Sequence, residues 1–143
     1  MNEFKSSEDI KNKLIISLGD PAGIGTEIIL KALGSKFLNK KIQPLLVGCK
    51  KNIDKTFSKL IKHGINNIPD PNNLNIIDIP LEKNVFPGVV NADTGAASFK
   101  WLFTATNLLL EGEANALVTA PISKIAWHKA GHQFAGQTEL LGK

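Results

Sequence analysis

The residues best suited to chemistry lie in one glycine-rich turn, residues 19–27, which reads Gly-Asp-Pro-Ala-Gly-Ile-Gly-Thr-Glu. An apolar run precedes the turn and another follows it, which predicts a strand, a turn and a helix in succession. Ligands of α/β proteins bind at the carboxyl ends of strands, where helix N-termini present free N–H groups. The Asp20 carboxylate suits a metal, an ammonium group or a hydroxyl, and glycines such as Gly23 allow a ligand to approach the backbone.

Two familiar phosphate-binding motifs do not match this turn. A P-loop requires Gly-Lys-Ser/Thr, whereas Gly25 is followed by Thr26 and Glu27. A dinucleotide-binding fingerprint requires a third glycine at the place where Ile28 stands. The turn therefore either lines a site for a small ligand or is a tight strand-to-helix connection without a ligand, and the residue types leave both interpretations open.

A second set of polar residues follows a later apolar run. Thr119 and Lys124 come just after this predicted strand, so they are expected at the same sheet edge as the glycine turn. A lysine near a helix N-terminus is electrostatically unfavourable, and a bound anion would offset that. Gln137, Thr138 and Glu139 add an amide, a hydroxyl and a carboxylate, which suit a small phosphorylated substrate. Alternatively, Thr138 caps a helix and Lys124 is an ordinary surface residue.

Alternating strands and helices must position these residues. Apolar runs predict strands at 13–18, 42–48, 75–79 and 116–119. Helical spacing and end signals predict helices at 26–33, 52–62, about 93–111, 123–130 and from 138 onward. This alternation indicates an α/β fold with a layered parallel sheet and right-handed crossovers.

The longest predicted helix carries apolar residues at helical spacing. Asp93 or Thr94 is the expected cap at its start. We expect its buried stripe to comprise Ala96, Phe99, Phe103, Thr106 and Leu110, widened by Leu102 and Leu109. Trp101 and Trp127 also lie on predicted helices, where packing is a more common role for tryptophan than stacking on a ligand.

Composition excludes several classes of function. The chain has 143 residues, enough for one domain with a hydrophobic core, and its 43% hydrophobic content is ordinary for a globular protein. The formal net charge is +4, but all 17 basic side chains other than histidine are lysine. Bidentate recognition of bases or phosphates by arginine is therefore impossible. We interpret the charge as a solvated surface, and expect no nucleic-acid partner.

Other features point to an intracellular, non-membrane protein. Cys49 is the single cysteine, so no internal disulfide exists, and its place after an apolar run predicts a packed thiol. Residues 1–12 are polar and have no apolar signal-peptide core, so we expect a flexible N-terminus. No segment approaches the ~20 apolar residues of a membrane span. His128 and His132 are separated by Gly131, which disfavours a zinc pair. We therefore expect a cytoplasmic location.

Three motifs occur in a recognisable order. They are Gly-Asp-Pro-Ala-Gly-Ile-Gly at 19–25, Val-Thr-Ala-Pro-Ile-x-Lys at 118–124 and Gly-Gln-Thr-Glu at 136–139. Together they resemble the N-terminal part of the 4-hydroxythreonine-4-phosphate dehydrogenase family of pyridoxal phosphate biosynthesis. Gly88 and Gly95 also fit, and the resemblance extends from about Leu14 to the end of the chain.

The resemblance implies a fold similar to the isocitrate and isopropylmalate dehydrogenases, with two α/β domains and a homodimer whose active site lies at the interface. Residues 13–143 would then be the N-terminal α/β portion of a longer dehydrogenase, and the fold here would be incomplete. The implied activity is NAD-dependent oxidation, with decarboxylation, of 4-phosphohydroxy-L-threonine. A divalent metal, which is zinc, magnesium or cobalt in the family, would act as a Lewis acid.

The resemblance also implies roles for individual residues. The family's substrate-binding His-Thr pair corresponds to Gln137 and Thr138. Glutamine can donate and accept hydrogen bonds, but it cannot carry a proton or a charge near pH 7. Other residues expected to line the site are Asp20, Gly23, Thr119, Lys124 and Glu139.

The family's metal ligands and most of its cofactor site correspond to positions after Lys143, so this chain supplies no metal ligand. We therefore expect the 143-residue chain alone to be inactive. The alternative function is that of a non-catalytic remnant or a domain that binds small phosphates.

Overall fold

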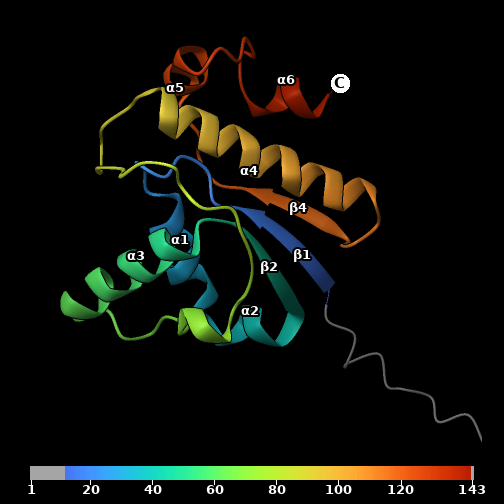
Figure 1. Cartoon of the computed structure of the whole chain (residues 1–143). Helices are drawn as coiled ribbons and strands as arrows, with labels where there is room; N and C mark the ends of the chain where they lie inside the picture. Colours follow the sequence, from blue (N-terminus) through green and yellow to red (C-terminus); the bar gives the residue numbers. More distant parts are fainter. Residues whose placement is uncertain (1–11, 143) are drawn as a thin grey trace, which may run out of the picture.

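The computed structural model describes residues 12–142, which form an α/β domain (Figure 1). Within these residues the strands are β1 (Asn12–Ser17), β2 (Ile42–Gly48), β3 (Asn75–Asp78) and β4 (Ala116–Thr119). The helices are α1 (Gly25–Leu33), α2 (Lys36–Lys41), α3 (Lys50–Lys62), α4 (Ala92–Leu110), α5 (Lys124–Lys129) and α6 (Gln137–Leu141), with a short 3-10 turn η1 (Pro71–Asn73).

These elements agree closely with the predicted strands and helices. The helix that the sequence did not predict is α2, a six-residue element between α1 and β2. The predicted flexible N-terminus lies outside the described residues except for Asn12, which is the first residue of β1. The predicted cap of the long helix was wrong. Asn91 is the N-cap of α4, and its Oδ1 accepts from Thr94 N at 2.9 Å. Thr94 Oγ1 accepts in return from Asn91 N at 3.2 Å, which completes a capping box.

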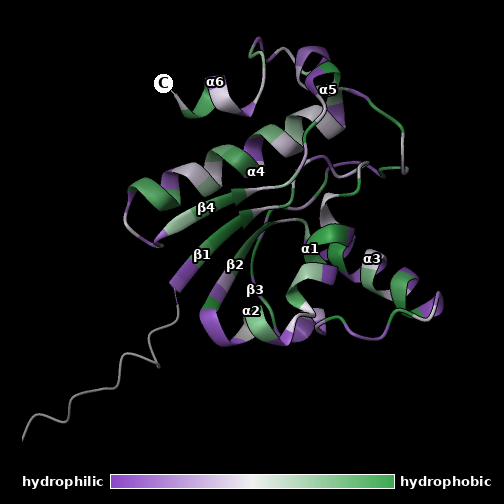
Figure 2. Cartoon of the chain, turned by 180° about the vertical axis from the view of Figure 1, so that it is seen from behind, coloured by the Kyte–Doolittle hydropathy of each residue, from purple (hydrophilic) through white to green (hydrophobic). Residues whose placement is uncertain are grey.

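The sheet is parallel, with the strand order β3-β2-β1-β4, as the α/β prediction required. The chain moves outward from β1 to β3 and then returns through α4 to the other side of β1. Right-handed crossovers therefore place α1 and α3 on one face and α4 on the other (Figures 1 and 2). The strand order reverses at β1, so the carboxyl ends of β1 and β4 flank the position where open α/β sheets usually bind ligands.

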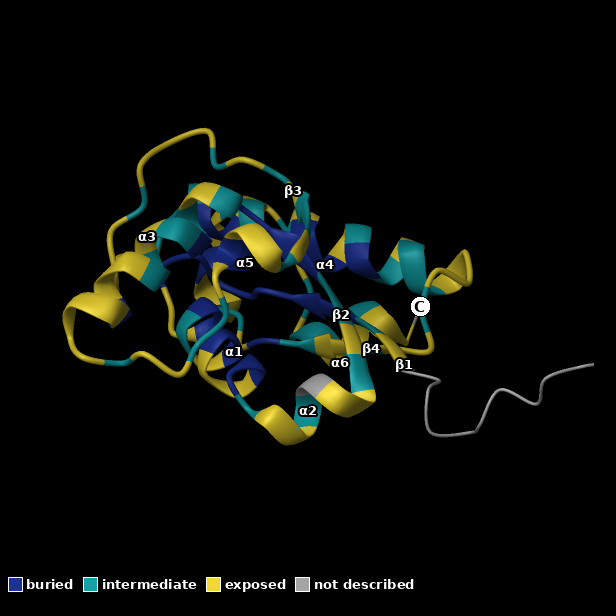
Figure 3. Ribbon diagram, turned by 90° about the horizontal axis from the view of Figure 1, so that it is seen from below, coloured by how far each residue is buried: buried dark blue, intermediate teal, exposed yellow. Residues whose placement is uncertain are grey.

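The core lies on both faces of the sheet, where the buried residues gather (Figure 3). Helix α4 buries Leu102 of the predicted stripe, but it does not bury the stripe as a whole. Phe103 is 51% exposed and Leu110 is 80% exposed, whereas the buried face carries Thr94, Gly95, Ser98, Trp101, Leu102 and Ala105. The prediction failed because α4 is apolar on more than one side. Trp101 and small residues meet the sheet, whereas Phe99 packs edge-on against Trp127 of α5.

Backbone contacts join the glycine turn to the loop that follows β4. Ala120 N donates to Ser17 O at 2.9 Å, and Asp20 N donates to Pro121 O at 2.9 Å. Gly19 has a positive φ of 73° and faces the Pro121 carbonyl, where a side chain would clash. A Cβ added at Gly25 would lie 2.9 Å from the Ala120 Cβ. Two of the three glycines are therefore required for packing of one loop on the other.

The glycine turn offers a matched pair of substitutions. Gly25→Ala should lower the free energy of unfolding by about 1–3 kcal/mol, because the new Cβ overlaps the backbone of Leu18 and the Ala120 side chain. Gly23→Ala should change it by less than about 0.5 kcal/mol, because its nearest neighbour, the Asp20 carbonyl oxygen, lies 3.4 Å from the new Cβ. Urea unfolding of both variants measures the difference. Equal losses would contradict this account of the turn.

Candidate functional site

The predicted site residues lie at the expected sheet edge, but they do not share one cavity. Asp20 follows β1, and Thr119 is the last residue of β4. Asp20 is only 6% exposed, and its Oδ1 accepts from Ala22 N at 2.8 Å within the turn. Burial raises the pKa of the Asp20 carboxyl, and the bond from Ala22 partly opposes this rise. Asp20 therefore serves the internal structure of the glycine turn. Gly23 is exposed at the tip of this turn.

Lys124 and the 135–139 segment surround a shallow, open pocket of about 640 Å³ next to the β4 end. It is lined by Pro121, Ile122, Lys124, Ala135, Gly136, Gln137, Thr138 and Glu139. Within residues 12–142, the Lys124 ammonium group has no hydrogen-bond or ion-pair partner. Its aliphatic chain passes over Gly136, where an added Cβ would lie 3.3 Å from Lys124 Cε and 3.9 Å from Nζ. The pocket thus combines a cation with a glycine that leaves room for it.

The remaining predicted residues have distinct roles around this pocket. Thr119 Oγ1 donates to Gln137 Oε1 at 3.0 Å, and Gln137 Nε2 donates to Ala120 O at 2.7 Å. Glu139 Oε2 accepts from Ala135 N at 2.6 Å, which closes its own turn. Thr138 is exposed in the first turn of α6. The N-cap of α6 is Gly136, so the alternative reading of Thr138 as a cap was wrong.

An aromatic cluster supports the segment that carries this pocket. The His132 ring stacks on Phe99 of α4, with a centroid distance of 3.6 Å and an interplanar angle of 6°. Phe134 lies against Phe99 and the buried Trp127. Trp127 Nε1 donates to Ser98 Oγ at 2.9 Å, and Trp101 Nε1 donates to Ile79 O at 3.2 Å, so both tryptophans pack as predicted.

Sequence reasoning missed His132 and Phe134 as supports of the site. The helical spacing predicted Phe99 to face the core. In the structure Phe99 is only half-buried, so its ring is free to stack on His132 and to lie against Phe134.

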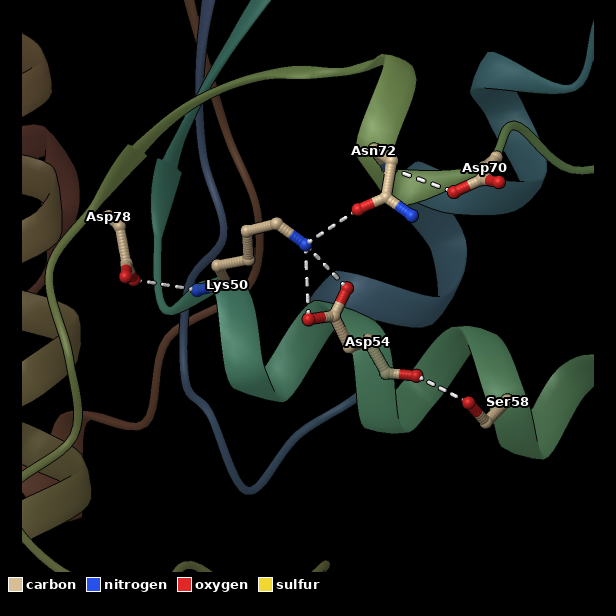
Figure 4. Close-up of polar contacts among 6 residues, drawn as sticks. All are labelled: Lys50, Asp54, Ser58, Asp70, Asn72 and Asp78. Atoms are coloured by element: carbon tan, nitrogen blue, oxygen red, sulfur yellow. Dashed lines mark hydrogen bonds and ion pairs between the residues drawn. The ribbon is translucent and has the colours of Figure 1, made fainter.

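A larger open groove, of about 880 Å³, lies by the carboxyl ends of β2 and β3 and was not predicted. Cys49 lines it and is buried, as expected for a packed thiol. The first backbone N–H of α3 beside this groove is engaged, because Asp78 Oδ1 accepts from Lys50 N at 2.8 Å (Figure 4). Lys50 Nζ in turn pairs with Asp54 at 2.9 Å. Lys51, Lys55 and Lys83 also line this groove, and Lys83 pairs with Asp93 at 3.1 Å.

The described residues do not fit the divalent metal that the resemblance implies. Across residues 12–142, no three or more His, Cys, Asp and Glu side chains are grouped so that they could hold a metal ion. We therefore assign no metal ligand to this part of the chain. In the same range, none of the helices combines the length and the apolar character that crossing a membrane requires.

The stacked histidine should make stability depend on pH. Burial lowers the pKa of the His132 imidazole from its ordinary value of 6.5. Between the lowered and the ordinary pKa, the unfolded chain binds more protons than the folded chain. The free energy of unfolding therefore rises with pH in this window, and this contribution is fully regained above pH 6.5. His132→Phe keeps an aromatic ring on Phe99 but removes the titration, so its stability should fall less on acidification. Urea unfolding across about pH 5 to 8 tests this. The prediction is wrong if the free energies of unfolding of wild type and His132→Phe change in parallel with pH.

The chain is similar to known proteins in both sequence and structure. Residues 40–143 match the family described as "Pyridoxal phosphate biosynthetic protein PdxA". The chain is 48% identical over 131 residues to a 4-hydroxythreonine-4-phosphate dehydrogenase of Synechococcus sp. (strain RCC307), covering 92% of this chain and 39% of that protein. It is 37% identical over 141 residues to a D-threonate 4-phosphate dehydrogenase of Pectobacterium atrosepticum, covering 91% of this chain and 43% of that protein.

Solved structures show the same likeness. The crystal structure of a 4-hydroxythreonine-4-phosphate dehydrogenase from Burkholderia phymatum matches with a TM-score of 0.82 at 25% identity, over 93% of this chain and 43% of that one. The enzyme of the same name from Klebsiella pneumoniae matches with a TM-score of 0.75 at 34% identity, over 95% of this chain and 44% of that one. The chain thus spans about two fifths of the length of its relatives, and it belongs to the PdxA family, of which it represents the N-terminal part.

Proposed function

We propose that this chain is the N-terminal part of a 4-hydroxythreonine-4-phosphate dehydrogenase, which oxidises 4-phosphohydroxy-L-threonine with NAD during pyridoxal 5′-phosphate (vitamin B6) biosynthesis. The relatives support this, because both kinds of enzyme named among them act on a compound phosphorylated at position 4. Within the chain, one observation carries the proposal. The Lys124 ammonium lies without a partner, among the described residues, in a pocket beside Thr138.

The pocket has the chemistry to hold a phosphate group. The Lys124 ammonium can donate charge-assisted hydrogen bonds to phosphate oxygens, which are stronger than bonds between neutral groups. Thr138 also lines the pocket, and its exposed hydroxyl can donate another. Gly136, beside Lys124, carries no side chain that would exclude the ligand. In this proposal the chain binds and orients the phosphorylated end of the substrate.

Other parts of the proposal rest on the resemblance. As the resemblance implies, a divalent metal would supply Lewis-acid polarisation of the forming carbonyl and would assist decarboxylation. No described residue fits it, so no step is assigned to it here. Gly19 and Gly25 pack against the Ala120–Pro121 segment, so the glycine turn is not assigned to the NAD pyrophosphate. The isocitrate and isopropylmalate dehydrogenase-like fold with its second domain, the homodimer and the cytoplasmic location likewise remain part of the proposal.

A second candidate function is a domain that binds small phosphates without catalysis. It is favoured by Gln137, which stands where the resemblance implies a histidine and which cannot transfer a proton. Binding alone does not distinguish the two candidates, because both use Lys124.

The phosphate site is tested with two lysines of the same helix. Inorganic phosphate should shift the backbone amide resonances of Lys124 and Thr138 in the full chain. Lys124→Met should weaken phosphate binding by about tenfold or more, as expected for loss of hydrogen bonds to a charged group. Lys129→Met is the control, because Lys129 Nζ donates to Val90 O at 3.2 Å from the other end of α5. Equal affinity of wild type and Lys124→Met would refute the site.

Catalysis is tested with a chimaera. The 143 residues alone should bind phosphate but reduce no NAD with 4-phosphohydroxy-L-threonine and added zinc or magnesium. Joined to the remaining part of the Synechococcus relative, they should reduce NAD, and Lys124→Met should abolish most of that activity. A chimaera that becomes active only with Gln137→His would instead favour the non-catalytic binding domain. The intact Synechococcus protein is the positive control.

A further inference from the structure

We infer that Gln137 is a positioning residue that fastens the 135–139 segment to the carboxyl end of β4 and leaves ligand contact to Lys124 and Thr138. This differs from the direct substrate contact that the resemblance implies for position 137. The inference rests on the proposed function, because it concerns the same pocket.

Both ends of the Gln137 side chain are engaged by the sheet edge. Its Oε1 accepts from Thr119 Oγ1 at 3.0 Å, and its Nε2 donates to Ala120 O at 2.7 Å. Ala120 is itself anchored, because its N–H donates to Ser17 O of β1 at 2.9 Å. The Gln137 amide thus links α6 to the edge strand β4 through bonds at both of its polar atoms, and through Ala120 to the neighbouring strand β1.

The segment that Gln137 holds follows the aromatic cluster of Phe99, His132 and Phe134, and its own helix is short. Helix α6 has five residues, and none of them is buried. A helix this short is unstable on its own and depends on tertiary contacts. Two hydrogen bonds to a buried edge of the sheet are therefore a substantial part of what positions it. Loss of the amide should loosen α6 without disturbing the core.

The position of Gln137 determines the shape of the pocket. Gly136 immediately precedes it, and Lys124 Cε lies 3.3 Å from the place of a Gly136 side chain. Thr138 immediately follows it and is exposed to the pocket. Holding Gln137 in place therefore sets the spacing between the ammonium and the hydroxyl that would bind phosphate.

The amide suits this role because it donates and accepts at the same time and does not titrate near neutral pH. A neutral imidazole could satisfy the same two partners, but on protonation it would lose its acceptor, and the Thr119 hydroxyl would have to turn from donor to acceptor. Gln137 therefore gives a link to β4 that is independent of pH over the physiological range. Gln137→His should convert it into a link that weakens on acidification.

The test follows amide hydrogen exchange and phosphate titration by NMR on the full chain. In Gln137→Met, exchange of the 135–142 amides should accelerate about tenfold, while β1 and β2 amides should not change. Thr119→Val should have a smaller effect, and the double variant should resemble Gln137→Met, because both substitutions break one network. Gln137→His should match wild-type exchange at high pH and exceed it at low pH.

A matched control separates positioning from ligand binding. Thr138→Val should weaken phosphate binding and leave exchange of the segment unchanged, whereas Gln137→Met should change both. In the wild type, saturating phosphate should move the Lys124 and Thr138 resonances and leave the Gln137 side-chain amide nearly in place.

The inference is overturned if the Gln137 side-chain amide shows the largest shift, or if Gln137→Met weakens binding without faster exchange. If phosphate moves no resonance in the wild type, the proposed function fails. The exchange data then decide separately whether Gln137 fastens the segment.

Discussion

The structure depends on parallel pairing of β1 with β4 and on the backbone bonds that extend this pairing past the strand ends. After the last ladder position, Ala120 N reaches Ser17 O, and Asp20 N reaches Pro121 O. Because these bonds are made by the main chain, they place two loops in contact that are about a hundred residues apart in the sequence. They lie where the strand order reverses, which is the usual ligand position in open parallel sheets. The candidate pocket, its lysine and its tether to β4 all follow from this junction.

The junction also changes the meaning of the glycines. In the sequence, a glycine-rich turn after a strand suggests space for a ligand. In the structure, Gly19 and Gly25 are glycine because the loop after β4 occupies the space that their side chains would need. The Asp20 carboxylate is enclosed in the same turn, and this burial raises its pKa. The turn is thus the inner wall against which the second loop packs, and the second loop carries the groups that can bind an anion.

Helix α4 shows how packing partners on both sides can obscure a periodic pattern. Its sheet-facing side carries Trp101 and Ala105, and its start packs closely on α5 through Gly95. Its outer side carries Phe99, which stacks on His132 and so supports the loop that leads to the pocket. The same helix therefore stabilises the core with one face and the site with another. Phe103 and Leu110 stay largely exposed within the described part of the chain.

The strands and their pairing were predictable from the sequence, because local signals mark the elements and a parallel sheet allows few ways to arrange them. Alternating apolar runs predicted the four strands and their parallel pairing, and strand-end positions predicted that Asp20 and Thr119 would lie at one edge. The short helix α2, the cap at Asn91 and the buried face of α4 depended on tertiary contacts that no local pattern contains. Residue types named Gln137, Thr138 and Lys124 as candidates, but they could not show which group is free. Only the folded chain decided that the Gln137 amide is bonded to β4 while the Lys124 ammonium extends over Gly136, because that depends on where two distant loops meet.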